Sequence, residues 1–381
     1  MTCKICFIGR NLHFRNTASG NVALFKQLIK HLPPFYDLSL ISLDDPVIHK
    51  KKYNSPGDAT LLSKLTRYES VLVSNYLDLF SFKVIDLLKQ YLYHIRPNVI
   101  HVFEINPLLI ILFKKISEKI GARLVYHMVL ALPPYYPVSD LINVKCVDVV
   151  IVSSKYSYDK LKSIASQKVY LIPPIIDTTI YRPLEYDKKK YRKYKTFLYI
   201  GPLDWKRLPL SFLKELVEKI LKKYNIRIKF VIAPRFQDDN KRVRKLKNIL
   251  MKGVAYHSFS VIYRKLSLEE KVKIYNEATL ILFPLSKSCY GIVDPPISLL
   301  EAMSCGSVVA STRVLSIPYL LISNYNGIIF RDVNDLEHVL RYIDTQAERI
   351  GLNARKTIEY LFTPKVVIPK INLIYKKLMK I

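Results

Sequence analysis

The feature that most constrains the fold of this chain is a regular alternation of short apolar runs with stretches of helical periodicity. Short apolar runs bounded by turn residues are typical of buried strands. Strands that alternate with helices predict a parallel sheet covered by helices on both faces. In the first half we expect strands at residues 4–8, 38–41, 71–73, 99–103, 123–127, 147–152 and 169–172, with helices at 20–31, 107–119 and 156–163.

The alternation starts again near residue 196, which indicates a second domain of the same kind. A length of 381 residues suits two domains of ordinary size. The predicted fold class is α/β, with two doubly wound, Rossmann-like parallel-sheet domains. The second-half strands are expected at residues 196–200, 228–233, 280–283, 307–311 and 327–330, and the helices at 210–222, 242–251, 268–278, 299–305 and 333–343.

The boundary between the domains is marked by a change in composition. Residues 172–177 carry a Pro-Pro pair, and residues 181–195 form a charged connector without an apolar period. We therefore expect an N-terminal domain at residues 1–185 and a C-terminal domain at 186–364, with a helix at 365–381 returning to the first. Because such folds bind ligands where strand carboxyl ends meet a crevice, we expect the active site in a cleft between the domains.

The charge of the chain is strongly basic, since 60 Lys+Arg against 31 Asp+Glu give +29. The excess is even: residues 1–200 hold 29 basic and 15 acidic side chains, and residues 201–381 hold 31 and 16. A basic run with tyrosines at residues 188–195 resembles an RNA-binding strip, and a second run spans 241–247. A solvated surface and an anionic membrane face are the alternative interpretations.

Several classes of protein are not expected from the composition. No signal peptide is apparent, and the longest purely apolar runs, such as residues 107–113, are too short to cross a bilayer. Five sparse cysteines, with a single CxxC at Cys3 and Cys6, fit a reducing compartment and predict no metal site. With 10 glycines and no GxGxxG, a nicotinamide or flavin cofactor is not expected.

Three places on this predicted frame offer binding groups. Ser19 and Gly20 begin a helix whose free N–H groups suit an anion, or they simply cap that helix. His127 ends a buried strand, where it is either a ligand contact or a structural histidine. The turn from Gly201 to Lys206 and Arg207 follows a strand, and two cations there suit a diphosphate leaving group unless they form an ordinary basic surface turn.

The most informative stretch is residues 283–309, which is predicted to run from loop to helix, glycine and strand. Ser298 and Glu301 have the S-x-x-E spacing of a capping box, in which each side chain satisfies the other's backbone N–H. That interpretation is compatible with a ligand role for Glu301.

The segment LEAMSCGSVVAS at residues 300–311 resembles the "LEAMACGxPVVAS" block of glycosyltransferase family 4 (group 1), whose members are retaining transferases with the GT-B fold. Weaker matches surround this segment in the expected order over nearly the whole chain, at Gly20, His127, residues 148–153, 172–183, Gly201, 275–284 and Asn326-Gly327. The resemblance implies transfer of a sugar from a nucleotide diphosphate to a hydroxyl acceptor that is lipid-linked, glycan or protein, without a metal or other cofactor.

The resemblance also implies roles for individual residues. Glu301 would accept hydrogen bonds from the ribose hydroxyls, and Lys206 or Arg207 would hold the diphosphate. Gly20 would allow close approach to the phosphate or acceptor, and His127 would contact a hydroxyl of the donor sugar.

The chain departs from the family pattern at three points. The glutamate expected eight positions before Glu301 is Val293, with Asp294 next to it and Pro295-Pro296 following. The segment before Glu301 is longer than usual, so Ser286, Ser288, Tyr290-Gly291 or Asp294 are candidates for the missing sugar contacts. Pro202 replaces the arginine that usually follows the turn glycine, which leaves more of the phosphate charge to Lys206 and Arg207.

Three alternatives stay open on the sequence: a sugar-nucleotide epimerase of the same architecture, a basic nucleic-acid-binding protein, and an inactive homologue. The positive charge is spread evenly over the two halves of the chain, and no nucleic-acid-binding motif is found, so nucleic acid is not expected as a partner. For the excess charge we expect a cytoplasmic protein that contacts an anionic membrane face peripherally, where a lipid-linked acceptor would lie.

Overall fold

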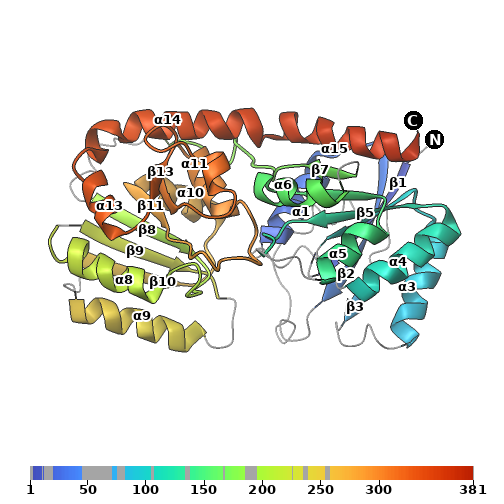
Figure 1. The fold of residues 1–381 in the computed structure, drawn as a ribbon, viewed down its shortest axis with the longest axis horizontal. Coiled ribbons are helices and arrows are strands. Elements are labelled where there is room, and N and C mark those ends of the chain that lie inside the picture. The colour runs from blue at the N-terminus through green and yellow to red at the C-terminus, as the bar shows by residue number, and fades with distance from the viewer. Residues whose placement is uncertain are drawn as a thin grey trace. The chain divides into compact units, whose positions relative to one another are not determined.

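The computed structural model divides the chain into two units, residues 1–175 with 364–381 and residues 176–363 (Figure 1). It describes residues 3–10, 12, 20–44, 71–74, 82–103, 107–133, 138–165, 168–184, 195–224, 226–234, 239–253 and 258–380. Each unit is a parallel sheet with helices on both faces. The two doubly wound domains predicted from the alternation are therefore confirmed.

The first unit contains a seven-stranded sheet in the order β3-β2-β1-β4-β5-β6-β7. The strand order reverses between β1 and β4, so this sheet has a switch point at the carboxyl ends of those strands. The strands are β1 (Cys3–Arg10), β2 (Tyr36–Asp44), β3 (Val71–Ser74), β4 (Val99–Phe103), β5 (Arg123–Met128), β6 (Val149–Val152) and β7 (Val169–Leu171).

Helices cover both faces of this sheet because its strands are apolar on both sides. Side chains of α1 (Gly20–His31) and α15 (Pro364–Met379) bury one face, with Phe25 and Ile371 in that core. The opposite face packs against α3 (Phe82–Ile95), α4 (Pro107–Ile120), α5 (Val138–Cys146) and α6 (Lys155–Ala165).

The second unit contains a six-stranded sheet in the order β10-β9-β8-β11-β12-β13. Its strands are β8 (Lys195–Gly201), β9 (Ile226–Ile232), β10 (Phe259–Tyr263), β11 (Leu280–Phe283), β12 (Val309–Thr312) and β13 (Ile328–Phe330). One face packs against α8 (Leu210–Leu216), its π-helical continuation η4 (Val217–Leu221), α9 (Asp239–Gly253) and α13 (Val333–Val339). The other packs against α10 (Leu268–Glu277), α11 (Ile297–Ser304), α12 (Ile317–Leu320) and α14 (Ile343–Leu361).

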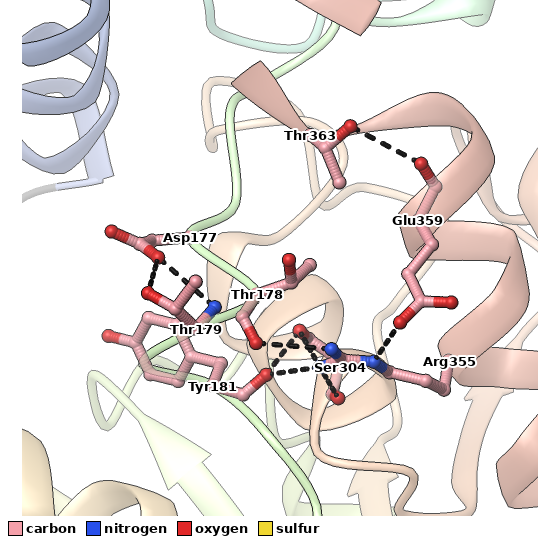
Figure 2. A network of polar contacts seen from close by, with 8 residues as sticks. All are labelled: Asp177, Thr178, Thr179, Tyr181, Ser304, Arg355, Glu359 and Thr363. Atoms are coloured by element: carbon pink, nitrogen blue, oxygen red, sulfur yellow. Dashed lines mark hydrogen bonds and ion pairs between the residues drawn. The ribbon is translucent and has the colours of Figure 1, made fainter. Parts of the chain in front are cut away.

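The division of the chain falls at Ile176, before the expected boundary at residue 186, because the connector packs against the second unit. Ile176 and Tyr181 are buried in the core that also holds α11 and α14. The guanidinium of Arg355 donates to the carbonyls of Thr178, Tyr181 and Ser304 at 3.1, 2.6 and 2.7 Å (Figure 2). Arg355 also donates to the Ser304 hydroxyl and to the Glu359 carboxylate, which brings its acceptors to five. These hydrogen bonds hold residues 178–181 against α11 and α14.

Two glycines allow α14 to pack closely on the end of α11. A Cβ atom at Gly351, inside α14, would lie 2.1 Å from the carbonyl oxygen of Gly306, which follows α11. Glycine is unfavourable inside a helix, so a close backbone approach is the physical reason for its presence at Gly351.

Several elements were missed or misplaced by periodicity. The edge strand β10 was not predicted; its residues are only partly buried, and Ser260 interrupts its apolar run. The helix expected at 210–222 changes to π-helix at Val217, and the nineteen-residue helix α14 was not predicted, since no helix was expected between residues 343 and 365. In the described part of the chain, no helix is long and apolar enough to span a membrane.

Candidate active site

The candidate site lies at the carboxyl edge of the second sheet, where two segments meet. The turn after β8, residues 202–208, is joined to the loop after β11 by a 2.8 Å hydrogen bond from the Ser286 amide to the Lys206 carbonyl. The Tyr199 hydroxyl donates to the Pro202 carbonyl at 2.7 Å and so fixes the start of the turn. The β8 turn and the loop that precedes α11 therefore form one surface, as expected from the strand ends.

Lys206 and Arg207 supply the positive charge of this surface. The Asp204 carboxylate accepts the Lys206 amide at 2.9 Å and shapes the turn, and the exposed Lys206 ammonium lies 5.2 Å from the centre of the Tyr290 ring. Burial raises the pKa of the Cys289 thiol to about 11, and the positive charges of Arg207 and Lys206 oppose that rise. The two cations are thus close enough to the loop to act on its groups electrostatically.

Asp294 is buried and is not exposed on this surface. Its side chain is 1% exposed, and it accepts hydrogen bonds from the hydroxyl and the amide of Ser316. These contacts give the carboxylate a structural role in holding the loop against the segment before α12. Gly291, three residues earlier, is exposed and has a left-handed φ of +70°, which favours glycine at that position.

The capping-box interpretation of Ser298 and Glu301 is wrong. The N-cap of α11 is Pro296, and no side chain caps it, because the helix begins at Ile297 and places Ser298 inside its first turn. A true capping box occurs instead at α10, where the Ser267 hydroxyl accepts the Glu270 amide and Glu270 accepts the Ser267 amide. The same S-x-x-E spacing therefore has different outcomes in the two helices.

Glu301 is the acidic centre of a buried cluster in the second unit. Its two carboxylate oxygens accept from the Lys271 ammonium at 2.8 and 2.7 Å, and the Tyr275 hydroxyl donates to it at 2.7 Å. Lys271 also lies 5.3 Å from the centre of the Tyr181 ring. Burial, and then the Glu301 charge, raise the pKa of Tyr275 well above its usual value, so this phenol stays a hydrogen-bond donor. The sequence motif identified Glu301 but gave no sign of Lys271 as its partner.

His127, in the first unit, is part of a chain of buried polar groups. It is 1% exposed, with its Nδ1 3.2 Å from Nε2 of His101 and its Nε2 3.3 Å from the Ser153 hydroxyl. Nδ1 of His101 lies 2.6 Å from the Tyr375 hydroxyl. Burial lowers the pKa of His127 to about 3, so its imidazole is neutral near pH 7. His101 and Tyr375 were missed, although His101 occupies the neighbouring strand of the same sheet.

The structure places the other predicted residues as follows. Gly201 ends β8 at the turn, and Gly20 is the first residue of α1. Ser19 and most of the basic run at 188–195 lie outside the described residues. The second basic run lies on α9. Gly201, Lys206, Arg207 and Gly291 thus share one edge, and Glu301 and Ser298 lie on the helix that follows it. Among the described residues no group of three His, Cys, Asp or Glu side chains is placed to hold a metal ion.

Solved structures share this fold over the whole chain. A glycosyltransferase from Rickettsia africae ESF-5 has a TM-score of 0.75 at 13% identity and covers 100% of this chain and 99% of its own. Sucrose-phosphate synthase from Thermosynechococcus elongatus has a TM-score of 0.74 at 15% identity, covering 99% of both chains. Anabaena HepE in complex with UDP-glucose has a TM-score of 0.75 at 14% identity, covering 98% and 99%. The fold is that of the GT-B glycosyltransferases.

The family of the second unit follows from its sequence. Residues 194–344 match the family model described as "Glycosyl transferases group 1". Those residues include both Lys206 and the Glu301 helix. This match over residues 194–344 agrees with the family resemblance that the sequence showed at residues 300–311. No curated protein sequence matches the chain.

Proposed function

We propose that the protein is a retaining glycosyltransferase that moves a sugar from a nucleoside diphosphate to a hydroxyl acceptor. The observation that carries the proposal is the cationic turn of Lys206 and Arg207 held against the loop before α11, inside a group 1 glycosyltransferase domain. A diphosphate gains negative charge as its bond to the sugar breaks, and fixed cations stabilise that charge in the transition state. The family match favours sugar transfer over the epimerase and nucleic-acid alternatives.

The two cations are proposed to do the work that a metal ion does in other transferases. Lys206 is exposed on one side of the turn, and the Asp204 contact fixes the backbone from which both side chains extend. Retention of the anomeric configuration is part of the proposal and rests on the family resemblance. On this basis activity should be insensitive to a chelator such as EDTA, and a metal requirement would contradict the assignment of the phosphate charge to Lys206 and Arg207.

Uridine diphosphate sugars are the first donors to test, because one protein of the same fold was solved with UDP-glucose. Glu301 is proposed to accept the ribose hydroxyls. In this structure both of its oxygens already accept from Lys271 and Tyr275, so ribose would use the remaining lone pairs or replace one of these donors. Ser286, Ser288 and Tyr290 are proposed to contact the sugar in place of the glutamate that Val293 replaces, whereas the buried Asp294 is a weaker candidate.

The decisive experiment separates binding, transfer and rearrangement. A thermal-shift screen over nucleotide sugars identifies the donor, since a ligand that binds only the folded state raises the melting temperature. Donor consumption is then measured with and without hydroxyl acceptors. Acceptor-dependent turnover is expected; turnover that needs no acceptor would favour the epimerase, and binding without turnover an inactive homologue.

Lys206→Ala combined with Arg207→Ala tests the phosphate assignment directly. We expect turnover to fall by about 100-fold or more, on the scale of removing a preorganised charge-stabilising group, while the fold is retained because Lys206 is exposed. The matched control is Lys214→Ala with Lys219→Ala, two cations on α8 and η4 behind the turn. A wild-type rate in the Lys206 and Arg207 variant would show that other residues hold the diphosphate.

The excess positive charge is proposed to bring the protein to an anionic membrane face, where a lipid-linked acceptor would lie. Helix α9 carries six Lys and Arg residues, and Met251 on the same helix is 54% exposed. A cationic helix with an exposed apolar side chain suits loose binding to anionic lipid, to which each nearby cation adds about 1 kcal/mol.

A further inference from the structure

Four buried side chains, from Tyr375 to Ser153, form a hydrogen-bonded series. The donors and acceptors that each side chain offers decide in which direction the protons are donated along this series. It runs from α15 through β4 and β5 to the residue after β6, and all four side chains are buried. The three contacts are Tyr375 to His101 at 2.6 Å, His101 to His127 at 3.2 Å and His127 to Ser153 at 3.3 Å. A neutral imidazole has one donor and one acceptor nitrogen, so choosing the tautomer of one histidine fixes that of the other.

Both histidines are neutral near pH 7, because they are buried. Burial lowers the pKa of each, and for His101 the neighbouring His127 lowers it further. At the 3.2 Å contact between His101 Nε2 and His127 Nδ1, one nitrogen must carry a proton and the other must accept it, because two N–H groups or two lone pairs would repel each other. Each ring therefore carries a single proton, and only two arrangements of the whole chain are possible.

The buried hydroxyl of Tyr375, at one end of the hydrogen-bonded series, selects between these two arrangements. Tyr375 is fully buried, its pKa is raised by burial, and among the described residues His101 Nδ1 is the hydrogen-bond partner of its hydroxyl. If His101 donated to Tyr375 instead, the phenolic proton would be left in the core without an acceptor, which costs about 1–3 kcal/mol. At the other end, Ser153 follows β6 at the carboxyl edge of the sheet, and its hydroxyl can accept from His127 because a hydroxyl rotates and offers both a donor and acceptor lone pairs.

We propose that Tyr375 and His101 are positioning residues that hold His127 as its Nε2-protonated tautomer, so that His127 donates toward the carboxyl edge of the sheet to an oxygen acceptor. In this arrangement Tyr375 donates to His101 Nδ1, His101 Nε2–H donates to His127 Nδ1, and His127 Nε2–H donates to Ser153. A ligand oxygen takes the place of Ser153, or accepts from it. His127 is thus a hydrogen-bond donor and not a base, which suits a sugar hydroxyl or a carbonyl oxygen.

Aromatic packing fixes the rings in this orientation. Phe103, on β4, stacks on His101 and on His127, with 4.7 Å between ring centres in both cases. On the adjacent strands Phe103 pairs with His127 and His101 pairs with Val125, so both histidines face the side of the sheet that α15 covers. The C-terminal helix therefore provides the group that sets the tautomer of a histidine on a central strand.

The direct test is nitrogen NMR on the full chain labelled with ¹⁵N-histidine, which distinguishes the two tautomers without any substrate. We expect His127 and His101 to be Nε2-protonated and neutral from about pH 8 down to about pH 5, where an ordinary histidine would titrate. Tyr375→Phe and His101→Leu are expected to give His127 a mixture of tautomers, and His101→Gln, which can accept and donate in the same order, to restore the wild-type form. An Nδ1-protonated His127 in the wild type would overturn the proposal.

Tyr36→Phe is the matched control, because it removes a similarly placed hydroxyl outside the chain. The Tyr36 hydroxyl donates to Asn372 on α15, and its ring packs edge-on against Tyr375. The control should leave the His127 tautomer unchanged. A change in Tyr36→Phe equal to that in Tyr375→Phe would show that general loosening of α15, and not the hydrogen-bonded chain, is responsible.

The kinetic consequence rests on the proposed function. With the donor identified, Tyr375→Phe should lower kcat by about 10-fold, on the scale of one misdirected hydrogen bond, and Tyr36→Phe by less than roughly twofold. If the His127 tautomer is as expected and no nucleotide sugar is turned over, the positioning role of Tyr375 and His101 is supported and the proposed function is wrong. If sugar transfer occurs and His127 is the Nδ1-protonated tautomer, the proposed function is supported and the positioning role of Tyr375 and His101 is wrong.

Discussion

At the scale of single residues, the most consequential feature is that key polar side chains are paired inside their own units. Glu301 accepts from Lys271 and Tyr275, and His127 lies between His101 and Ser153. Such pairing holds each side chain in one orientation before a ligand arrives, which is how preorganised sites stabilise developing charge. The same pairing means that substitutions at these positions change stability as well as binding.

Replacing Glu301 is expected to destabilise the second unit and weaken donor binding. Glu301→Gln leaves the Lys271 ammonium without its counter-charge, at a cost of about 2 kcal/mol. This is less than the loss for a fully buried pair, because the Lys271 side chain is 25% exposed. Urea unfolding of the single variant and of Glu301→Gln with Lys271→Met measures the effect. The double variant should recover part of the loss, and strict additivity would contradict a direct pair.

The buried histidines predict a loss of stability in mild acid. The pKa of His127 is lowered from 6.5 to about 3 in the folded chain, so between these values the unfolded chain binds more protons. Its contribution is therefore complete above pH 6.5 and is lost as the pH falls toward 3, at up to about 1.4 kcal/mol per pH unit. Urea midpoints at neutral and mildly acidic pH should differ less in His127→Gln than in the wild type. His338→Gln, at an exposed position of α13, should keep the wild-type difference.

At the scale of secondary-structure elements, the carboxyl edge of the second sheet is built by short connections that hydrogen-bond to each other. The β8 turn and the β11 loop share the Ser286 to Lys206 bond, and the hydroxyl of Thr312, the last residue of β12, donates to the Leu285 carbonyl at 2.5 Å. These bonds allow a long loop to follow β11 while its first residues stay fixed. The helix that follows, α11, begins without a side-chain cap.

The two S-x-x-E segments provide an element-scale prediction. Ser267→Ala removes the cap of α10 and should lower the free energy of unfolding by about 1 kcal/mol. Ser298→Ala should change it by less than roughly 0.5 kcal/mol, because Ser298 caps nothing at α11. Chemical denaturation of the two variants side by side tests the difference, and an equal loss would show that Ser298 caps α11 in solution.

At the scale of the whole molecule, the sheets and the charge have separate roles. Two parallel sheets present strand carboxyl ends where the candidate groups lie, and residues 194–344, in the second unit, match the group 1 glycosyltransferase model. The net charge of +29 far exceeds what Lys206 and Arg207 require. Many of the described cations lie on helix surfaces, such as α9, so they act on the surroundings of the protein more than on the reaction.

The proposed membrane contact predicts salt-sensitive binding to anionic vesicles. Charge reversal of Lys241, Arg244 and Lys245 on α9 should abolish most co-sedimentation with phosphatidylserine vesicles at low salt, and neutral vesicles should bind neither protein. Reversal of Lys365, Lys376 and Lys377, three exposed cations on α15, is the control for net charge alone. Equal losses in the two variants would place the binding in overall charge, and no binding of the wild type would remove the membrane proposal.

The sequence by itself determined the doubly wound class, the two domains and Glu301, because periodicity and a local motif are encoded by neighbouring residues. Predicted strands at 99–103 and 280–283 match β4 and β11 at both ends. Only the tertiary structure decided what those residues contact. The tertiary structure pairs residues that are far apart in the chain: Lys271 with Glu301, Ser316 with Asp294, and Tyr375 with His101. Such contacts depend on how helices and strands pack, and one sequence has no local signal for packing.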